Sequence, residues 1–140
     1  YLRDSFMANK INQKLQYLKK ALLRLEEMIN EPVSEKRAEI DSVIQRFEFC
    51  FELYWKTLQA ILESLGENVA FPKEILQSAY KGGLIVDEKI WLAMLRDRNQ
   101  TSHVYDEGAA DAIYTNIKQS YAHVLASTFQ TLEGKFYIHD

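Results

Sequence analysis

Apolar residues recur at spacings of three and four along most of this chain. Between residues 10 and 30 they fall on one helical face, at Ile11, Leu15, Leu18, Leu22, Leu25 and Ile29. Such spacing is typical of an amphipathic α-helix, in which one turn contains about 3.6 residues. The pattern therefore predicts a first helix over residues 10–30, which ends before Pro32.

Four further helices are predicted from the same periodicity and from capping residues. A long helix runs from the N-cap Ser34 to the C-cap Gly66. A short helix begins at Pro72, and another follows Asp87 as its cap. Asp106 caps the last helix, which ends near residue 134.

Three long helices, two shorter ones and the lack of any two-residue period indicate an all-α protein. The expected architecture is an antiparallel up-and-down four-helix bundle with an extra short helix. The 140 residues, 47% of them hydrophobic, suffice for one packed core. We therefore expect a single domain over residues 1–140, in which residues 1–9 and 134–140 are peripheral.

Charge and cysteine content narrow the classes of function. Seventeen Lys and Arg against 20 Asp and Glu leave a net charge of −3, unlike the basic balance of a protein that coats long nucleic acid. Cys50 is the only cysteine, so no intramolecular disulfide is expected and a cytoplasmic location fits best. Because no apolar run approaches the ~20 residues of a membrane span, we expect no membrane partner.

Candidate chemistry is concentrated in the polar segment of residues 97–106. It contains the acids Asp97 and Asp106 together with Arg98, His103 and Tyr105. The guanidinium of an arginine offers a fork of donors suited to phosphate, and a histidine exchanges protons near neutral pH. Such a pair could bind and cleave a phosphodiester without a metal.

Helix geometry restricts this interpretation. On an ideal helix Arg98 and His103 would lie about 140° apart, whereas Arg98 and Tyr105 would share a face. Joint action of Arg98 and His103 requires that the helix ends, bulges or meets a second copy. The alternative is a solvated helix end, whose polar side chains make only local hydrogen bonds.

A second candidate is the aromatic segment of residues 46–56. Glu48, Glu52 and Lys56 form a polar stripe at i, i+4 spacing beside a wide aromatic surface. Most of the segment is expected to be core. The acidic pair could instead orient Arg98 or His103 across the bundle, or the aromatic face could bury against a second subunit.

No motif predicts a cofactor or a metal site. The glycines at residues 82–83 have the wrong spacing for a phosphate-binding or dinucleotide-binding loop. The three histidines lack the spacing of zinc ligands. Cys50 lies in an apolar helical stretch, where a buried thiol is more often inert.

Several short motifs occur together in order along the chain. They are SVIQRFE at 42–48, FELYWK at 51–56, FPKE at 71–74, GLI at 83–85, Trp91, and Arg98-Asn99 followed by HVYDE at 103–107. Jointly they resemble the nucleotidyltransferase substrate-binding proteins of the HEPN superfamily, over about residues 11–132. Lys73 stands where relatives often carry an arginine, which is a mild departure.

The resemblance implies a helical homodimer encoded beside a minimal nucleotidyltransferase, as in prokaryotic toxin and antitoxin pairs. In the superfamily, an Arg and a His separated by four to six residues mark a metal-independent ribonuclease site at the dimer interface. Arg98 and His103 match this pattern. His103 would then be the general acid or base, Arg98 would stabilise charge on the phosphate, and Asn99 would assist positioning.

Tyr105 matches an extension of the same pattern. In proteins of this type, the partner nucleotidyltransferase adds adenylate to that tyrosine and silences the toxin. The resemblance implies that bulk and negative charge beside Arg98 would then exclude RNA phosphate.

Three hypotheses for function remain open from the sequence. The first is a ribonuclease toxin neutralised by adenylylation of Tyr105, and the second is a non-catalytic subunit that docks substrate or nucleotide for the partner. The third is a structural dimerisation bundle. The acidic balance is a difficulty for the first, because RNA affinity would need a local patch such as Arg96, Arg98 and Lys118.

Overall fold

The computed structural model describes residues 2–100 and 106–138, with side chains from residue 5 onward, and every regular element in these ranges is helical. In chain order the elements are α1 (Leu2–Ile29), α2 (Ala38–Ser64), α3 (Pro72–Lys81), α4 (Glu88–Gln100), α5 (Glu107–Asn116), the π-helical segment η2 (Ile117–Tyr121) and α6 (Ala122–Phe136). The predicted all-α bundle is confirmed. No helix among the described residues is both long and apolar enough to cross a membrane.

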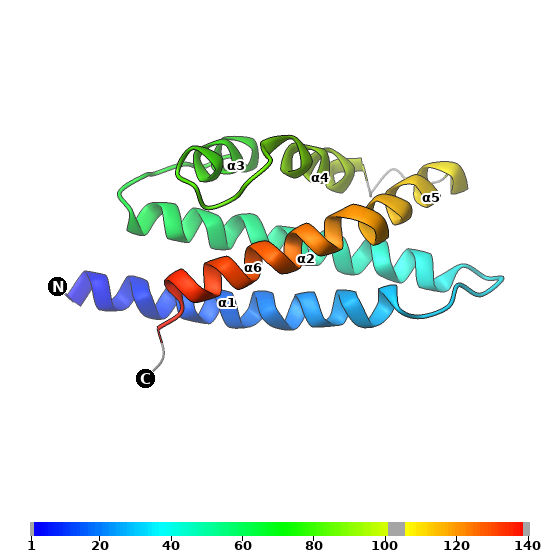
Figure 1. Cartoon of the computed structure of the whole chain (residues 1–140), viewed down its shortest axis with the longest axis horizontal. Helices are drawn as coiled ribbons and strands as arrows, with labels where there is room; N and C mark the ends of the chain where they lie inside the picture. The colour runs from blue at the N-terminus through cyan, green and yellow to red at the C-terminus, as the bar shows by residue number, and fades with distance from the viewer. Residues whose placement is uncertain (1, 101–105, 139–140) are drawn as a thin grey trace.

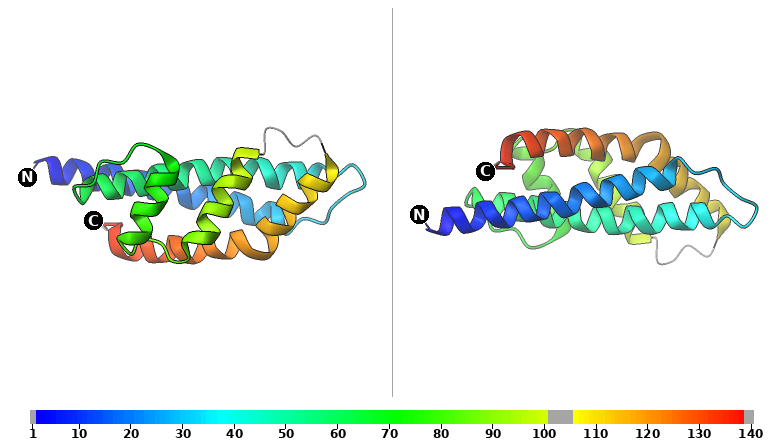
Figure 2. Two further views of the ribbon diagram at one scale, coloured as in Figure 1. Left: turned by 90° about the horizontal axis from the view of Figure 1, so that it is seen from above. Right: turned by 90° about the horizontal axis from the view of Figure 1, so that it is seen from below.

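The two longest helices form an antiparallel pair. α1 and α2 lie side by side along most of their length, and α5, η2 and α6 form a continuous third rod beside them (Figure 1). α3 and α4 cross the bundle between α2 and α6, as seen from above (Figure 2). Because this crosswise pair returns the chain to the far end, α6 runs in the same direction as α2, which refines the predicted up-and-down order.

Aromatic side chains join the layers of the core. The Trp91 indole of α4 is fully buried, with its ring centroid 5.0 Å from that of Tyr54 and 6.4 Å from that of Phe51. The Tyr54 hydroxyl donates to the Leu125 carbonyl at 2.8 Å, which ties α2 to α6. The prediction that the 46–56 segment is mostly core holds for its buried residues Phe47, Cys50, Phe51 and Tyr54, whereas Phe49 is 62% exposed.

The predicted N-cap of α2 was wrong. The helix begins at Ala38 with Arg37 as N-cap, at a φ of 60°. Ser34 does not accept from the first helical amides as an N-cap would. Instead its backbone N–H and hydroxyl donate to the Glu39 carboxylate at 3.0 and 2.7 Å. Residues 30–37 therefore form a loop.

The other predicted helix ends agree more closely with the structure. Pro72 occupies the first turn of α3, and Asp106 is the N-cap of α5. Gly66, at a φ of 90°, follows the end of α2, and such a backbone conformation favours glycine. α1 begins at Leu2 rather than at residue 10.

Residues just beyond α6 dock on the first helix. The Asn12 side-chain amide exchanges two hydrogen bonds with the backbone of Ile138, at 2.8 and 2.9 Å. Gln16 Nε2 donates to the Tyr137 hydroxyl at 2.9 Å. The C-terminal end of the described chain is therefore held against the first half of α1.

The buried Cys50 thiol makes the free energy of unfolding fall at alkaline pH. Burial raises the pKa of its thiol from 9.0 to about 12, so the unfolded chain loses this proton first. The stabilisation is complete below pH 9.0 and declines by about 1.4 kcal/mol per pH unit as the pH rises toward the folded pKa. Urea unfolding between about pH 8 and pH 11 should show a shallower decline for Cys50→Ala; equal slopes would contradict a buried protonated thiol.

Candidate functional site

The last turn of α4 carries three of the predicted site residues, Asp97, Arg98 and Asn99. Trp91 and Met94 are the buried anchors of this helix. Arg98 lies seven and four residues after them, so it shares their inward face. Asn99 lies on the exposed side.

Arg98 contacts α2 through Glu52. Its Nη2 donates to Glu52 Oε2 at 3.0 Å, and the two side chains are only 29% and 32% exposed. Glu52 also accepts from Trp55 Nε1 at 3.2 Å and contacts Lys56 Nζ at 3.4 Å. A contact between the acidic stripe of α2 and Arg98 was one of the possibilities left open by the sequence, and for Glu52 that contact is present. Glu48 lies one turn earlier and is half-buried.

Asp97 is held by the third rod of the bundle. Its Oδ2 accepts from the Tyr121 hydroxyl at 2.6 Å and from Asn116 Nδ2 at 3.1 Å. Burial, followed by the adjacent Asp97 carboxylate, raises the pKa of Tyr121, so the phenol remains a donor. The Tyr121 ring also stacks on Phe47 at a centroid distance of 5.6 Å.

The π-helical turn that carries Tyr121 was not predicted from the sequence. In η2 the backbone N–H of Ala122 bonds to the carbonyl of Ile117, five residues earlier. The extra residue in this turn rotates the following positions relative to an α-helix, and π-helical turns occur frequently at functional sites. Here the turn ends at the residue that anchors Asp97.

Two other predicted residues, His103 and Tyr105, lie outside the described residues, so their approach to Arg98 remains a prediction. Asp106 caps α5, where its Oδ1 accepts from the Gly108 N–H at 3.1 Å. In the proposed basic patch, Lys118 Nζ lies 5.9 Å from the ring centroid of Tyr114, and Arg96 is exposed.

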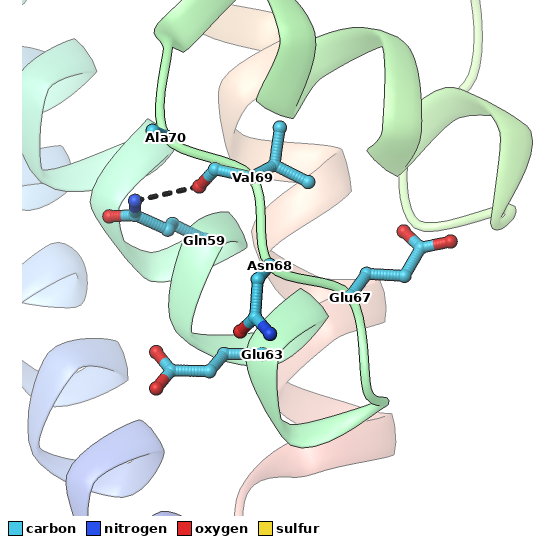
Figure 3. Close-up of a pocket in the computed structure, with 6 residues that line it drawn as sticks. All are labelled: Gln59, Glu63, Glu67, Asn68, Val69 and Ala70. Atoms are coloured by element: carbon cyan, nitrogen blue, oxygen red, sulfur yellow. Dashed lines mark hydrogen bonds between the residues drawn. The ribbon is translucent and has the colours of Figure 1, made fainter.

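Two cavities beside α2 were not predicted from the sequence. One, of about 270 Å³, is lined by Gln59, Glu63, Glu67, Asn68, Val69 and Ala70 (Figure 3). Its two carboxylates make it unsuited to phosphate. The other, of about 230 Å³, lies between α1 and α2 and is lined by three lysines. The signal in the sequence that could have indicated it was Lys10 and Lys14 at i, i+4 spacing on α1.

The helical fold agrees with that of one family of proteins. The chain belongs to the family described as nucleotidyltransferase substrate binding protein like, whose model matches residues 13–134. The family predicted from the motifs is therefore confirmed, and the match includes all of the candidate site residues.

Particular relatives make this likeness more specific. The chain is 40% identical over 83 residues to the probable ribonuclease HepT of Haemophilus influenzae, an alignment that covers 56% of this chain and 57% of that protein. The matched part thus spans just over half of that relative.

Two solved structures are also similar. A crystal structure of a protein from Thermus thermophilus has a TM-score of 0.75 and 38% identity, covering 82% of this chain and 98% of that one. A Haemophilus influenzae structure, described as the fold of a substrate binding domain of a nucleotidyltransferase, has a TM-score of 0.59 and 29% identity, covering 89% and 98%.

Replacing Tyr121 by Phe should destabilise the fold by about 1–2 kcal/mol, because the Asp97 carboxylate loses the donor of a buried residue and keeps that of Asn116. Urea unfolding at neutral pH measures the change. Tyr114→Phe is the control, since it removes the same hydroxyl from a half-buried tyrosine of the same rod whose ring contacts Lys118. Equal losses in the two variants would contradict a specific role for the Tyr121 hydroxyl.

Proposed function

We propose that this chain is the HEPN-type subunit of a two-gene nucleotidyltransferase system and acts as a metal-independent ribonuclease. Membership of the family and the likeness to a protein named as a probable ribonuclease support this function. The observation that carries it is the Arg98 guanidinium, held half-buried by Glu52 at the end of α4. Five residues later along the chain comes His103.

The contact with Glu52 prepares Arg98 for phosphate. A guanidinium fixed by a carboxylate through one nitrogen loses less entropy when it binds a second anion. Arg98 would stabilise charge on the scissile phosphate. Asn99, next to it on α4, would help to position the RNA.

The proposed reaction needs only proton transfers. His103 accepts the proton of the ribose 2′-hydroxyl, whose oxygen attacks the adjacent phosphorus while the bond to the 5′-oxygen breaks. His103, now protonated, returns a proton to the departing 5′-oxygen. The products are one RNA fragment with a 2′,3′-cyclic phosphate and one with a 5′-hydroxyl. A homodimer, with His103 of one copy facing Arg98 of the other, would relieve their angular separation on one helix.

The nuclease proposal predicts RNA cleavage by the purified protein in EDTA. A structured RNA should be cut by the wild type, and His103→Ala or Arg98→Ala should lower the rate at least about 100-fold, because acid-base catalysis by His103 and stabilisation of phosphate charge by Arg98 each contribute that much or more. Denaturing gels give the rates. His123→Ala, which removes an exposed histidine of α6, should cleave like the wild type.

Two results would contradict this proposal. The first is intact RNA with wild-type protein whose Tyr105 is shown by mass to be unmodified. The second is equal activity in the wild type and His103→Ala, which would indicate a contaminating nuclease.

Adenylylation of Tyr105 is the proposed means of control. The phenol oxygen would attack the α-phosphate of ATP bound to the partner, forming a phosphodiester and releasing pyrophosphate. The added charge and bulk would exclude RNA phosphate from Arg98.

With its partner transferase and ATP, the chain should gain the mass of one adenylate and lose nuclease activity, whereas Tyr105→Phe should do neither. An adenylate on Tyr105→Phe would refute the assignment of this residue.

The second candidate function is a non-catalytic subunit that docks substrate or nucleotide for the transferase. The description of the family and of the second solved structure favours it. It predicts a stable complex with the transferase. It also predicts no RNA cleavage by the wild type or by His103→Ala.

A further inference from the structure

Three lysines from two helices converge on the cavity between α1 and α2. Lys10 and Lys14 reach it from α1 and Lys56 from α2, and its volume is about 230 Å³. Gln13, Tyr17 and Thr57 complete most of its polar lining. We refer to this cavity as the lysine pocket.

The charges in the lysine pocket are only partly balanced. Lys10 Nζ lies 3.9 Å from Glu63 and Lys56 Nζ lies 3.4 Å from Glu52. Lys14 forms no ion pair with a carboxylate in the described part of the chain. Burial, followed by repulsion from Lys10 and Lys56, lowers the pKa of Lys14. An anion between these ammonium groups would relieve their repulsion.

A neutral donor faces the same space. The Tyr17 hydroxyl accepts from Gln13 Nε2 at 3.2 Å, so its own proton can be donated to a ligand. Ammonium groups and a hydroxyl are donors that suit a phosphate. The neighbouring cavity, with Glu63 and Glu67 on its wall, would repel one (Figure 3).

The lysine pocket is adjacent to Arg98. One carboxylate separates them, since Glu52 Oε1 contacts Lys56 Nζ at 3.4 Å and Glu52 Oε2 contacts Arg98 Nη2 at 3.0 Å. A chain of phosphates that reached Arg98 could therefore continue into the pocket. Such a local site would also give an acidic protein affinity for a polyanion.

We propose that the lysine pocket binds a backbone phosphate of RNA, beside the nucleotide at Arg98. This inference rests on the proposed function for the identity of its ligand and extends it by a second binding site. It is a site of binding and positioning and takes no part in bond cleavage.

The test measures binding separately from cleavage. A fluorescent 2′-O-methyl RNA lacks the attacking hydroxyl, so it reports affinity whether or not the protein is a nuclease. Fluorescence anisotropy over a range of salt concentrations would compare wild type with the double variant Lys10→Gln, Lys14→Gln. Lys56 stays unchanged because it touches Glu52.

The matched control is the double variant Lys19→Gln, Lys89→Gln. Lys19 faces α6 through a 3.7 Å contact with Glu133, and Lys89 is exposed on α4. Each double variant removes two positive charges and so changes the net charge from −3 to −5. Both should unfold at the wild-type urea concentration, which shows that any difference in binding is local.

The pocket variant should bind the RNA about tenfold more weakly at low salt. Its plot of log affinity against log salt should be shallower by about 0.7 for each phosphate that the protein no longer neutralises. The control should bind like the wild type. The inference fails if wild type does not bind, if the pocket variant binds normally, or if both doubles lose affinity equally.

Two further readouts separate RNA-phosphate binding in the lysine pocket from the nuclease proposal and from binding of nucleotide phosphates. Pocket-dependent binding without any cleavage in EDTA would refute the nuclease and leave the phosphate site standing. If ATP at matched ionic strength displaces the RNA, and Lys10→Gln, Lys14→Gln weakens ATP binding as well, the pocket serves nucleotide phosphates and the RNA assignment is wrong.

Discussion

Trp91 fixes the position of α4 because its indole is fully buried against Tyr54 and Phe51 of α2. Its Nε1 has no hydrogen-bond partner in the described part of the chain, a deficit of about 1–3 kcal/mol. Removing a buried tryptophan side chain generally costs about 3–5 kcal/mol. Aromatic packing therefore outweighs the unsatisfied donor, and the crosswise helix is held with its last turn against α2.

Two polar contacts then set the orientation of that last turn. Arg98 is tied to α2 through Glu52, and Asp97 is tied to the third rod through Tyr121. These side chains are half-buried or buried, so their contacts are screened less by salt than contacts between fully exposed side chains. Neighbouring side chains of one helix turn are thus anchored to different elements, which restrains both rotation and tilt of the helix end.

The sequence predicted the helices better than the contacts between them. Apolar spacing and the residues Pro72, Gly66 and Asp106 identified most helix ends, because these signals act within one turn of the chain. Ser34 misled because a serine hydroxyl can also donate, here to Glu39. The π-helical turn was missed because one i to i+5 step leaves the apolar pattern on either side nearly unchanged.

At the candidate site, too, the sequence predicted features that are local in the chain and did not predict those that depend on contacts between helices. The motif identified Arg98, and the i, i+4 stripe of α2 suggested its partner, since both signals are local in sequence. The lysine pocket depends on how α1 and α2 are rotated about their axes, which brings Lys10 and Lys14 to Lys56 from more than 40 residues away. Periodicity shows which face of a helix is polar and cannot show which polar side chains of two helices meet.

The net charge of −3 is a weaker objection to phosphate binding than the sequence alone suggested. Salt screens exposed charges beyond about 8–10 Å, so a phosphate responds mainly to groups near it. Between α1 and α2 those groups are three lysines, with Glu52 and Glu63 paired to two of them. Because these acids lie beside the lysines, they would confine an anion to the space around Lys14, and they favour occupation of one defined position over a diffuse basic surface.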